Sequence, residues 1–159
     1  MQRTIHIICG GTGAGKSTYS KVLAEKSGAI HYAIDDWIAT LYGPDKPHDV
    51  DYEWYIERIE RIEAMMWRII EGSSAEYILD LGFSLKSHRQ KFYDLAAMAG
   101  INAQLHYLDV DAAERWRRVC KRNDEQGDTF ALIVSREDFD FMENLFEEPE
   151  HDEPLCVTK

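Results

Sequence analysis

Short runs of apolar, β-favouring residues alternate along the chain with longer stretches in which apolar residues recur at helical spacing. The short runs predict strands at residues 4–9, 29–34, 77–81, 103–108 and 155–158. The longer stretches predict helices at residues 17–26, 51–71, 85–99, 111–121 and 135–146. Because strands and helices alternate in this way, we expect an α/β fold with a mostly parallel sheet.

Two of the expected helices carry further signals. Within residues 51–71, apolar side chains recur at helical spacing with Glu and Arg residues between them, which indicates one buried and one solvated face. Ser135 followed by Asp138 matches a capping box. The last helix is therefore expected to begin at this box and to run to about Phe146.

Length and composition indicate one domain across residues 1–159, with 45% hydrophobic and 30% charged residues. No apolar run is long enough to span a bilayer, and the N-terminus lacks a signal-peptide pattern. The three cysteines and six histidines show no metal-ligand spacing. We therefore expect a cytoplasmic domain with reduced thiols, no membrane segment and an acidic, irregular tail at about 147–159. The sequence leaves the oligomeric state open.

The formal net charge of −11 restricts the class of partner. Such an acidic surface repels a phosphate backbone, so nucleic acid is not an expected partner. ATP is also anionic, and it would need a local pocket of positive charge against this background.

One motif gives that pocket a location. Residues Gly10–Ser17 read GGTGAGKS and fit the G-x-x-x-x-G-K-[ST] phosphate-binding loop, directly after the first expected strand and before the first expected helix. Glycines allow several backbone N–H groups to point into one concavity that holds phosphate oxygens. The alternative is a glycine-rich turn before an ordinary helix. We expect phosphate binding by Gly11, Thr12, Gly13, Ala14, Gly15, Lys16, Ser17 and Thr18.

Two side chains of this motif have separate expected roles. Lys16 can reach the β- and γ-phosphates, and it is expected to act in catalysis. The hydroxyl of Ser17 can ligate Mg²⁺. The motif therefore predicts ATP and Mg²⁺ as cofactors.

Carboxylates follow two of the expected strands. Asp35 and Asp36 end the second strand, and Asp80 lies near the end of the third. In parallel sheets these ends face the ligand, so Asp35 is expected to accept the proton of an acceptor hydroxyl. Asp80 is expected to contact the substrate or to help hold Mg²⁺. The alternatives are a helix N-cap for Asp36 and a satisfied strand-end residue for Asp80.

Basic residues are scarce and gather on the helix at 111–121 and just after it. Arg118 and Arg122 lie one turn apart and are expected to hold the transferring phosphate when a lid at about 118–134 closes. Arg115 and Arg117 are expected instead to pair with Glu114 and Asp111 on a solvated helix face. Arg89, shortly after the third strand, is expected to face the substrate.

These segments resemble a known group, the small P-loop kinases that include gluconate kinase, chloramphenicol phosphotransferase and the polynucleotide 5′-kinase domain. The resemblance extends to about Phe146 and rests on four stretches: Gly10–Thr18, Ile34–Trp37, Leu79–Phe83 and the Arg118–Arg122 pair. It implies a three-layer P-loop fold with helices on both faces of a five-stranded parallel sheet in the order 2-3-1-4-5. It also implies that Asp35 activates the acceptor hydroxyl and that Arg122 bridges the phosphates.

The sequence also departs from these relatives. Polynucleotide kinases follow the aspartate pair with an arginine that meets substrate phosphate, and this chain has Ile38 there. The acceptor-pocket residues of gluconate kinases are not evident. We therefore expect an ATP-dependent phosphotransferase that acts on a hydroxyl of a small molecule.

Two alternatives stay open at this point. The first is a nucleotide-binding switch or NTPase without a small-molecule acceptor, for which a water-positioning residue near the γ-phosphate would be the signal. The second is a toxin-like kinase of nucleotide sugars, which would carry an added partner-binding segment. No such residue or segment is identified in the sequence.

Overall fold

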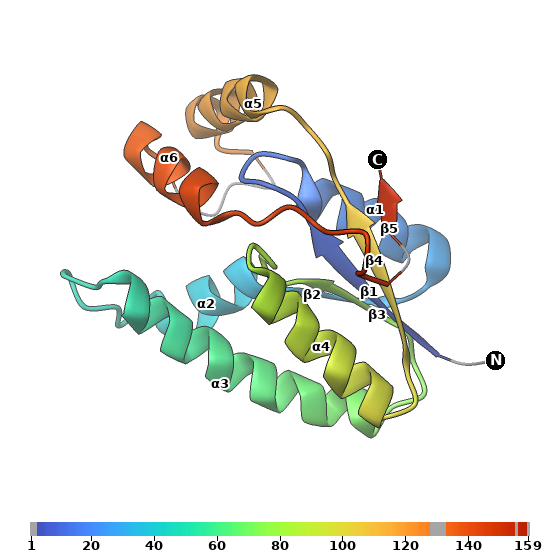
Figure 1. The fold of residues 1–159 in the computed structure, drawn as a ribbon. Coiled ribbons are helices and arrows are strands. Elements are labelled where there is room, and N and C mark those ends of the chain that lie inside the picture. The colour runs from blue at the N-terminus through green and yellow to red at the C-terminus, as the bar shows by residue number, and fades with distance from the viewer. Residues whose placement is uncertain (1–2, 128–132, 155, 159) are drawn as a thin grey trace.

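Five parallel strands form the sheet at the centre of the molecule (Figure 1). The computed structural model describes residues 3–127, 133–154 and 156–158. The strands lie in the order β2-β3-β1-β4-β5, with every neighbouring pair parallel. The predicted fold class and strand order are therefore confirmed. The strands are β1 (Thr4–Cys9), β2 (Ile30–Ala33), β3 (Tyr77–Asp80), β4 (Asn102–Tyr107) and β5 (Cys156–Thr158).

Helices cover both faces of this sheet, and others lie beyond the carboxyl ends of its strands (Figure 1). Two of them, α3 and α4, pack on one face, α1 packs on the other, and α5 and α6 lie beyond the carboxyl ends of the strands. The helices are α1 (Lys16–Ser27), α2 (Ile34–Tyr42), α3 (Tyr52–Glu71), α4 (Lys86–Met98), α5 (Ala112–Glu125) and α6 (Arg136–Leu145).

The central strand β1 contributes side chains to both layers of the core. Ile5 and Ile7 face the cluster made with α3 and α4, whereas Ile8 faces the cluster made with α1. All three are essentially inaccessible to solvent. Burying each of these side chains contributes about 1.5–3 kcal/mol. This two-sided burial explains why β1 reads as a continuous apolar run rather than an alternating one.

The second strand is shorter than expected, and the difference moves the aspartate pair. The sequence predicted a strand to Ile34, but β2 ends at Ala33 and α2 begins at Ile34. Ala33 is the N-cap, so the interpretation of Asp36 as a cap is wrong. Asp35 and Asp36 instead lie in the first turn of a helix, where its dipole favours negative charge.

The helix predicted at residues 111–121 is α5, and it is longer than predicted. Its C-terminal end lies at Glu125 rather than Lys121, so the first part of the predicted lid at 118–134 is helical. Residues 128–132 of that lid lie outside the described residues, and the lid stays a prediction. The capping box of Ser135 and Asp138 is present at the start of α6.

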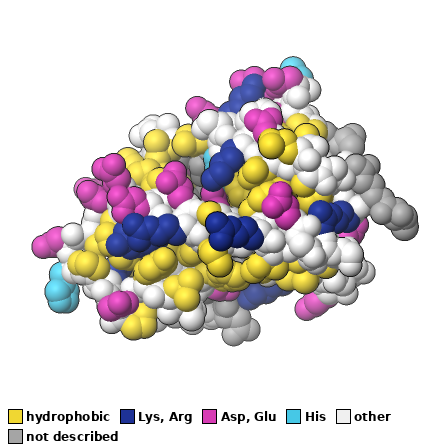
Figure 2. Space-filling view, turned by 90° about the horizontal axis from the view of Figure 1, so that it is seen from below, with side chains coloured by type: hydrophobic (Ala, Val, Ile, Leu, Met, Phe, Trp, Pro, Cys, Tyr) yellow, Lys and Arg dark blue, Asp and Glu magenta, His cyan; other side chains and the backbone are white. Residues whose placement is uncertain are grey.

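The face formed by α3 and α4 is mixed in character. Hydrophobic, acidic and basic side chains are interspersed across it (Figure 2). Exposed apolar side chains on these two helices include Met65, Ile69 and Met98. Among the described residues, none of the helices combines the length and the apolar character needed to cross a membrane.

Candidate functional site

The loop between β1 and α1 has the backbone shape that the glycine motif predicted. Gly13 and Gly15 adopt positive φ angles of 82° and 93°, a region that favours glycine. The Ala14 amide donates to the Gly11 carbonyl at 3.1 Å, which turns the loop toward the helix. Because the N-cap of α1 is Gly15, no side chain of its own caps the first amides of the helix. These amides form a site suited to an anion.

Lys16 reaches back over this loop. Its ammonium donates to the carbonyl oxygens of Gly10 at 2.8 Å and Gly11 at 3.2 Å. The positive charge is thereby held beside the loop amides.

Ser17 and Asp80 meet on the face of the sheet that α1 covers. The Ser17 hydroxyl donates to the Asp80 carboxylate at 3.0 Å, and Asp80 is only 6% exposed. His31 of β2 lies 3.7 Å from the same carboxylate. A hydroxyl oxygen beside a carboxylate oxygen fits the ligand preference of Mg²⁺. Among the described residues, no group of three or more His, Cys, Asp or Glu side chains could hold a metal, so phosphate and water oxygens would complete the shell.

Asp35 lies among the charged groups of the loop, the sheet and α5. The pKa of Asp35 is raised, first because surrounding protein limits hydration of the carboxylate, and next because Asp80 repels its charge. Lys16 opposes this shift, Asp36 adds to it, and Arg122 opposes it. As a whole residue Asp35 is exposed, although protein atoms gather round its carboxylate, and within the described chain its side chain makes no hydrogen bond or ion pair. The structure thus brings four of the predicted site residues together.

The two predicted phosphate-binding arginines of α5 differ in their contacts. Arg118 donates to the Ala14 carbonyl at 3.3 Å and to Glu114 at 2.8 Å. The Nε of Arg122 is buried and has no hydrogen-bond partner among the described residues. A buried, unused guanidinium donor whose charge acts on Asp35 is a group that a phosphate oxygen would satisfy.

Arg115 does not follow its expected pairing. The sequence placed it on a solvated helix face with Glu114 or Asp111, but it is 7% exposed and pairs with Glu143 of α6. Arg117, by contrast, pairs with Glu114 at 2.7 Å as expected. The Arg115 pairing had no local signal, because its partner lies 28 residues later. Only the tertiary fold brings the two together.

The sequence predicts that Arg89 faces the substrate, but in the structure Arg89 does not reach an open cavity. Its guanidinium is fully buried and forms two hydrogen bonds with Glu153, at 2.7 and 2.8 Å. It also donates to the carbonyls of Phe83 at 3.0 Å and Glu147 at 2.9 Å. Tyr93 donates to the same Glu153 carboxylate at 2.9 Å. These bonds give Arg89 a structural role, and they anchor part of the tail that the sequence predicted as irregular.

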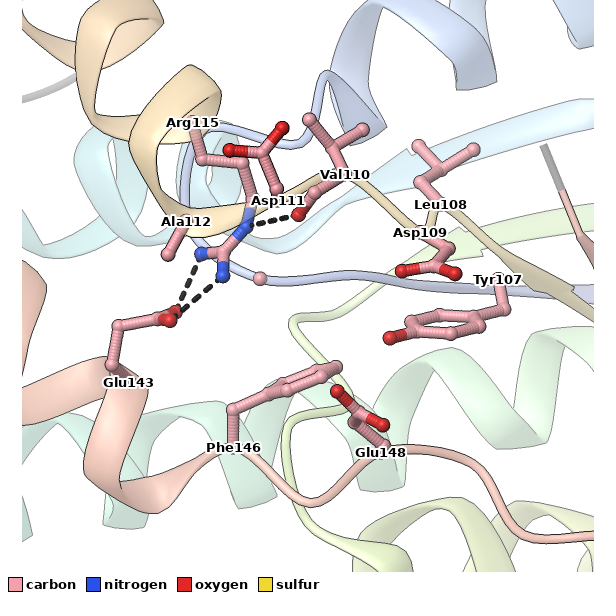
Figure 3. Close-up of a pocket in the computed structure, with 11 residues that line it drawn as sticks. Tyr107, Leu108, Asp109, Val110, Asp111, Ala112, Arg115, Glu143, Phe146 and Glu148 are labelled. Carbon is pink, nitrogen blue, oxygen red and sulfur yellow. Dashed lines mark hydrogen bonds and ion pairs between the residues drawn. The ribbon is translucent and has the colours of Figure 1, made fainter.

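A cavity of about 290 Å³ lies beside the phosphate loop at Gly11 (Figure 3). It is lined by Gly11, the end of β4, the start of α5 and the end of α6, and the Arg115–Glu143 pair forms part of its wall. Burial raises the pKa of Tyr107 in this cavity to about 12, and Glu148 and then Asp109 add to the shift. None of Lys16, Ser17, Asp35 and Asp80 lines it, but Gly11 of the phosphate loop does, so the cavity adjoins that loop.

Comparisons with known proteins agree with the fold. A sequence model of the AAA domain family matches residues 5–149. A search of curated proteins by sequence finds no match. The fold resembles a gluconokinase from Sinorhizobium meliloti 1021, with 16% identity, coverage of 99% of this chain and 81% of that one, and a TM-score of 0.66.

Two further structures have the same fold and contain nucleotides. The Mycobacterium tuberculosis APS kinase CysC, solved with AMPPNP and APS, is 17% identical; 99% of this chain and 88% of that one align with a TM-score of 0.63. Chaetomium thermophilum Kti12, solved with ADP-AlF3, is 16% identical; 97% of this chain and 88% of that one align with a TM-score of 0.68. At these identities the likeness is one of fold.

Proposed function

This chain belongs to the AAA domain family and has a P-loop kinase fold, and from this we propose that it is an ATP-dependent kinase that phosphorylates a hydroxyl of a small molecule. Nucleotide binding is the first part of the proposal. The loop amides and Lys16 would hold the phosphates, and Ser17 with Asp80 would hold Mg²⁺, which neutralises phosphate charge when bound. A cytoplasmic location belongs to the same proposal.

The transfer step is assigned to Asp35. An acceptor hydroxyl must lose its proton as its oxygen bonds to the γ-phosphorus and the bond to the β-phosphate oxygen breaks. Asp35 is exposed to solvent, and the charges that shift its pKa are those of the proposed phosphate site. Its raised pKa makes it a better proton acceptor than an ordinary aspartate. The single observation that carries the proposal is the hydrogen bond from Ser17 to Asp80 beside a loop whose carbonyls hold the Lys16 ammonium.

Arg118 and Arg122 are assigned to the transferring group. Negative charge is spread over the phosphoryl oxygens during transfer, and guanidinium groups stabilise it. Arg122 has a buried Nε with no partner among the described residues, and Arg118 already contacts the loop at Ala14. Both would act through positioning and charge, without a covalent intermediate.

The test is an acceptor screen read as ADP release. Wild-type protein with Mg·ATP is mixed with metabolites and with aminoglycoside- and phenicol-like alcohols, and each hit is checked for a phosphorylated product. Asp35→Asn should retain Mg·ATP affinity and lose transfer by about 10²- to 10⁴-fold. Asp36→Asn, a change in the same helical turn, is the matched control and should retain activity.

Each outcome of the screen separates the alternatives. ATP consumption that no acceptor stimulates, with no labelled product in a cell extract, would favour the switch or NTPase. Transfer at the wild-type rate by Asp35→Asn would refute the assignment of Asp35 as the base.

A further inference from the structure

We infer that Arg115 is a positioning residue that shapes the phosphate loop from outside, and that Glu143 of α6 holds Arg115 in place. The inference rests on the proposed nucleotide site, because it concerns how that site keeps its form. Arg115 does not itself contact phosphate in this proposal. It acts through the backbone of the loop.

The first evidence is that each of the three guanidinium nitrogens donates at least one hydrogen bond. Its Nε donates to the Val110 carbonyl at 2.7 Å, and Nη1 donates to the Thr12 carbonyl of the loop at 3.3 Å. Nη1 and Nη2 also bond the two carboxylate oxygens of Glu143, at 2.5 and 2.7 Å (Figure 3). The Arg115 guanidinium also lies 5.6 Å from the centre of the buried Phe139 ring. A planar fork fixed on so many sides has one orientation.

The second evidence is the close fit between Arg115 and two glycines. A Cβ on Gly11 would overlap the guanidinium group. A Cβ on Gly13 would lie 2.5 Å from the Arg115 carbonyl oxygen and 2.9 Å from Val119. Only glycine allows the loop and α5 to approach this closely, so the position of Arg115 constrains the path of the loop from Gly11 to Gly13.

The third evidence is the partner of Arg115. An arginine that binds phosphate directly is expected to have donors available, as Arg122 has. Arg115 instead forms a bidentate pair with a carboxylate, and the pair raises the pKa of Arg115. The negative charge of Glu143 near a phosphate site is unfavourable for binding, so its presence indicates a geometric role.

The geometric role and the charge of Glu143 have opposite effects on Mg·ATP affinity, so the direction of the change in a Glu143 variant distinguishes them. Glu143→Gln keeps the side-chain shape and removes one negative charge near the site. If Glu143 holds Arg115 in position, the variant should bind Mg·ATP about tenfold more weakly by titration calorimetry. If Arg115 is a direct phosphate ligand, the same variant frees its donors and binds more tightly. Unchanged or tighter binding overturns the inference.

Two further variants separate shape from charge. Arg115→Lys keeps the positive charge but loses the fork, so it should bind as weakly as Arg115→Gln. Recovery of wild-type affinity by lysine would contradict the inference. Arg117→Gln is the matched control, because Arg117 pairs with Glu114 on the exposed side of the same helix and should leave affinity unchanged.

A spectroscopic measurement distinguishes this role from general destabilisation. In nucleotide-free protein, the backbone amide resonances of Gly11 and Gly13 should shift in Glu143→Gln and stay unchanged in Arg117→Gln. Unshifted loop amides in folded Glu143→Gln would refute the link from Glu143 to the loop. If wild-type protein bound no Mg·ATP, the proposed function would fail, and the amide shifts would still test this link.

Discussion

Two clusters near the carboxyl ends of the strands each contain an arginine and a carboxylate, and they differ in how far these charged groups have hydrogen-bond and ion-pair partners. In the buried cluster, Arg89 bonds both oxygens of Glu153 and two backbone carbonyls. In the cluster at the phosphate loop, Arg122 has a buried Nε with no partner in the described chain, and Asp35 makes no ion pair there. Residue type alone therefore does not distinguish an arginine whose hydrogen bonds are satisfied from one with an unused donor.

The physical reason is the cost of leaving a charge unpaired. A buried ion pair that satisfies its hydrogen bonds is retained because breaking it costs about 3–5 kcal/mol. An unpaired group lowers stability, and it is available to a ligand for the same reason. Removing groups from the first cluster should therefore affect folding, whereas removing groups from the second should affect function.

The largest expected effect is on function, at the loop cluster. Lys16→Ala removes the ammonium that we propose neutralises the β- and γ-phosphates, so acceptor-dependent ADP release should fall by about 10³-fold or more. Far-ultraviolet circular dichroism and the thermal midpoint should match wild type. Substantial remaining activity would show that the phosphates bind elsewhere.

The next effect is on stability, at the buried cluster. Glu153→Gln leaves Arg89 buried without its counter-charge and should lower the free energy of unfolding by about 3 kcal/mol in urea titrations. Mg·ATP affinity should not change. A variant that lost affinity and kept its stability would contradict the division between the clusters.

The pH dependence of that variant has a defined sign. Burial acts to raise the pKa of Glu153, but hydrogen bonds from Arg89, the Glu150 amide and Tyr93 prevail and lower it. The stability contributed by Glu153 is thus fully present above its ordinary pKa of about 4.5 and is lost as pH falls through the lowered value. The difference between wild type and Glu153→Gln should shrink in acid.

A smaller effect is expected for Arg122→Gln. Because its Nε has no partner among the described residues, the substitution should change stability little. Loss of the proposed charged contact from Arg122 to the phosphates should lower acceptor-dependent turnover by about ten- to a hundredfold. A drop in thermal midpoint without a loss of turnover would place Arg122 with the structural arginines.

The smallest effect is a gain of stability in Asp35→Asn. The pKa of Asp35 is raised in the folded protein, so its ionised form opposes folding at neutral pH. The variant should therefore melt at a higher temperature at pH 7, and the gain should vanish as pH falls below the ordinary value of 3.8. A lower melting temperature at pH 7 would show that Asp35 stabilises the fold.

The fold was predictable because its signals are local. Apolar runs, glycine positions and the Ser135–Asp138 box each involve neighbours in the chain, and they identified the strands and every described helix except α2. Ile34 was assigned to the wrong element because an apolar residue between a strand and a helix fits either period. The carboxylates could be placed at one edge because parallel strands end there.

The distinction among the arginines could not be predicted. Arg89 finds its partner 64 residues later and Arg115 finds its partner 28 residues later. No spacing rule reaches across those distances, and nearby acids such as Glu114 offered a plausible pairing for Arg115 that the structure does not form. Pairing at long range depends on the sheet order, which is known only once the fold is assembled.

The ion pair between Arg89 and Glu153 also affects how the protein matures on the ribosome. Translation at about 5–20 residues per second separates the two side chains by several seconds. During that interval Arg89 has been synthesised, but Glu153, the carboxylate that pairs with it in its buried position, has not. We therefore expect stable docking of α4 onto the sheet only after Glu153 has been synthesised and can pair with Arg89.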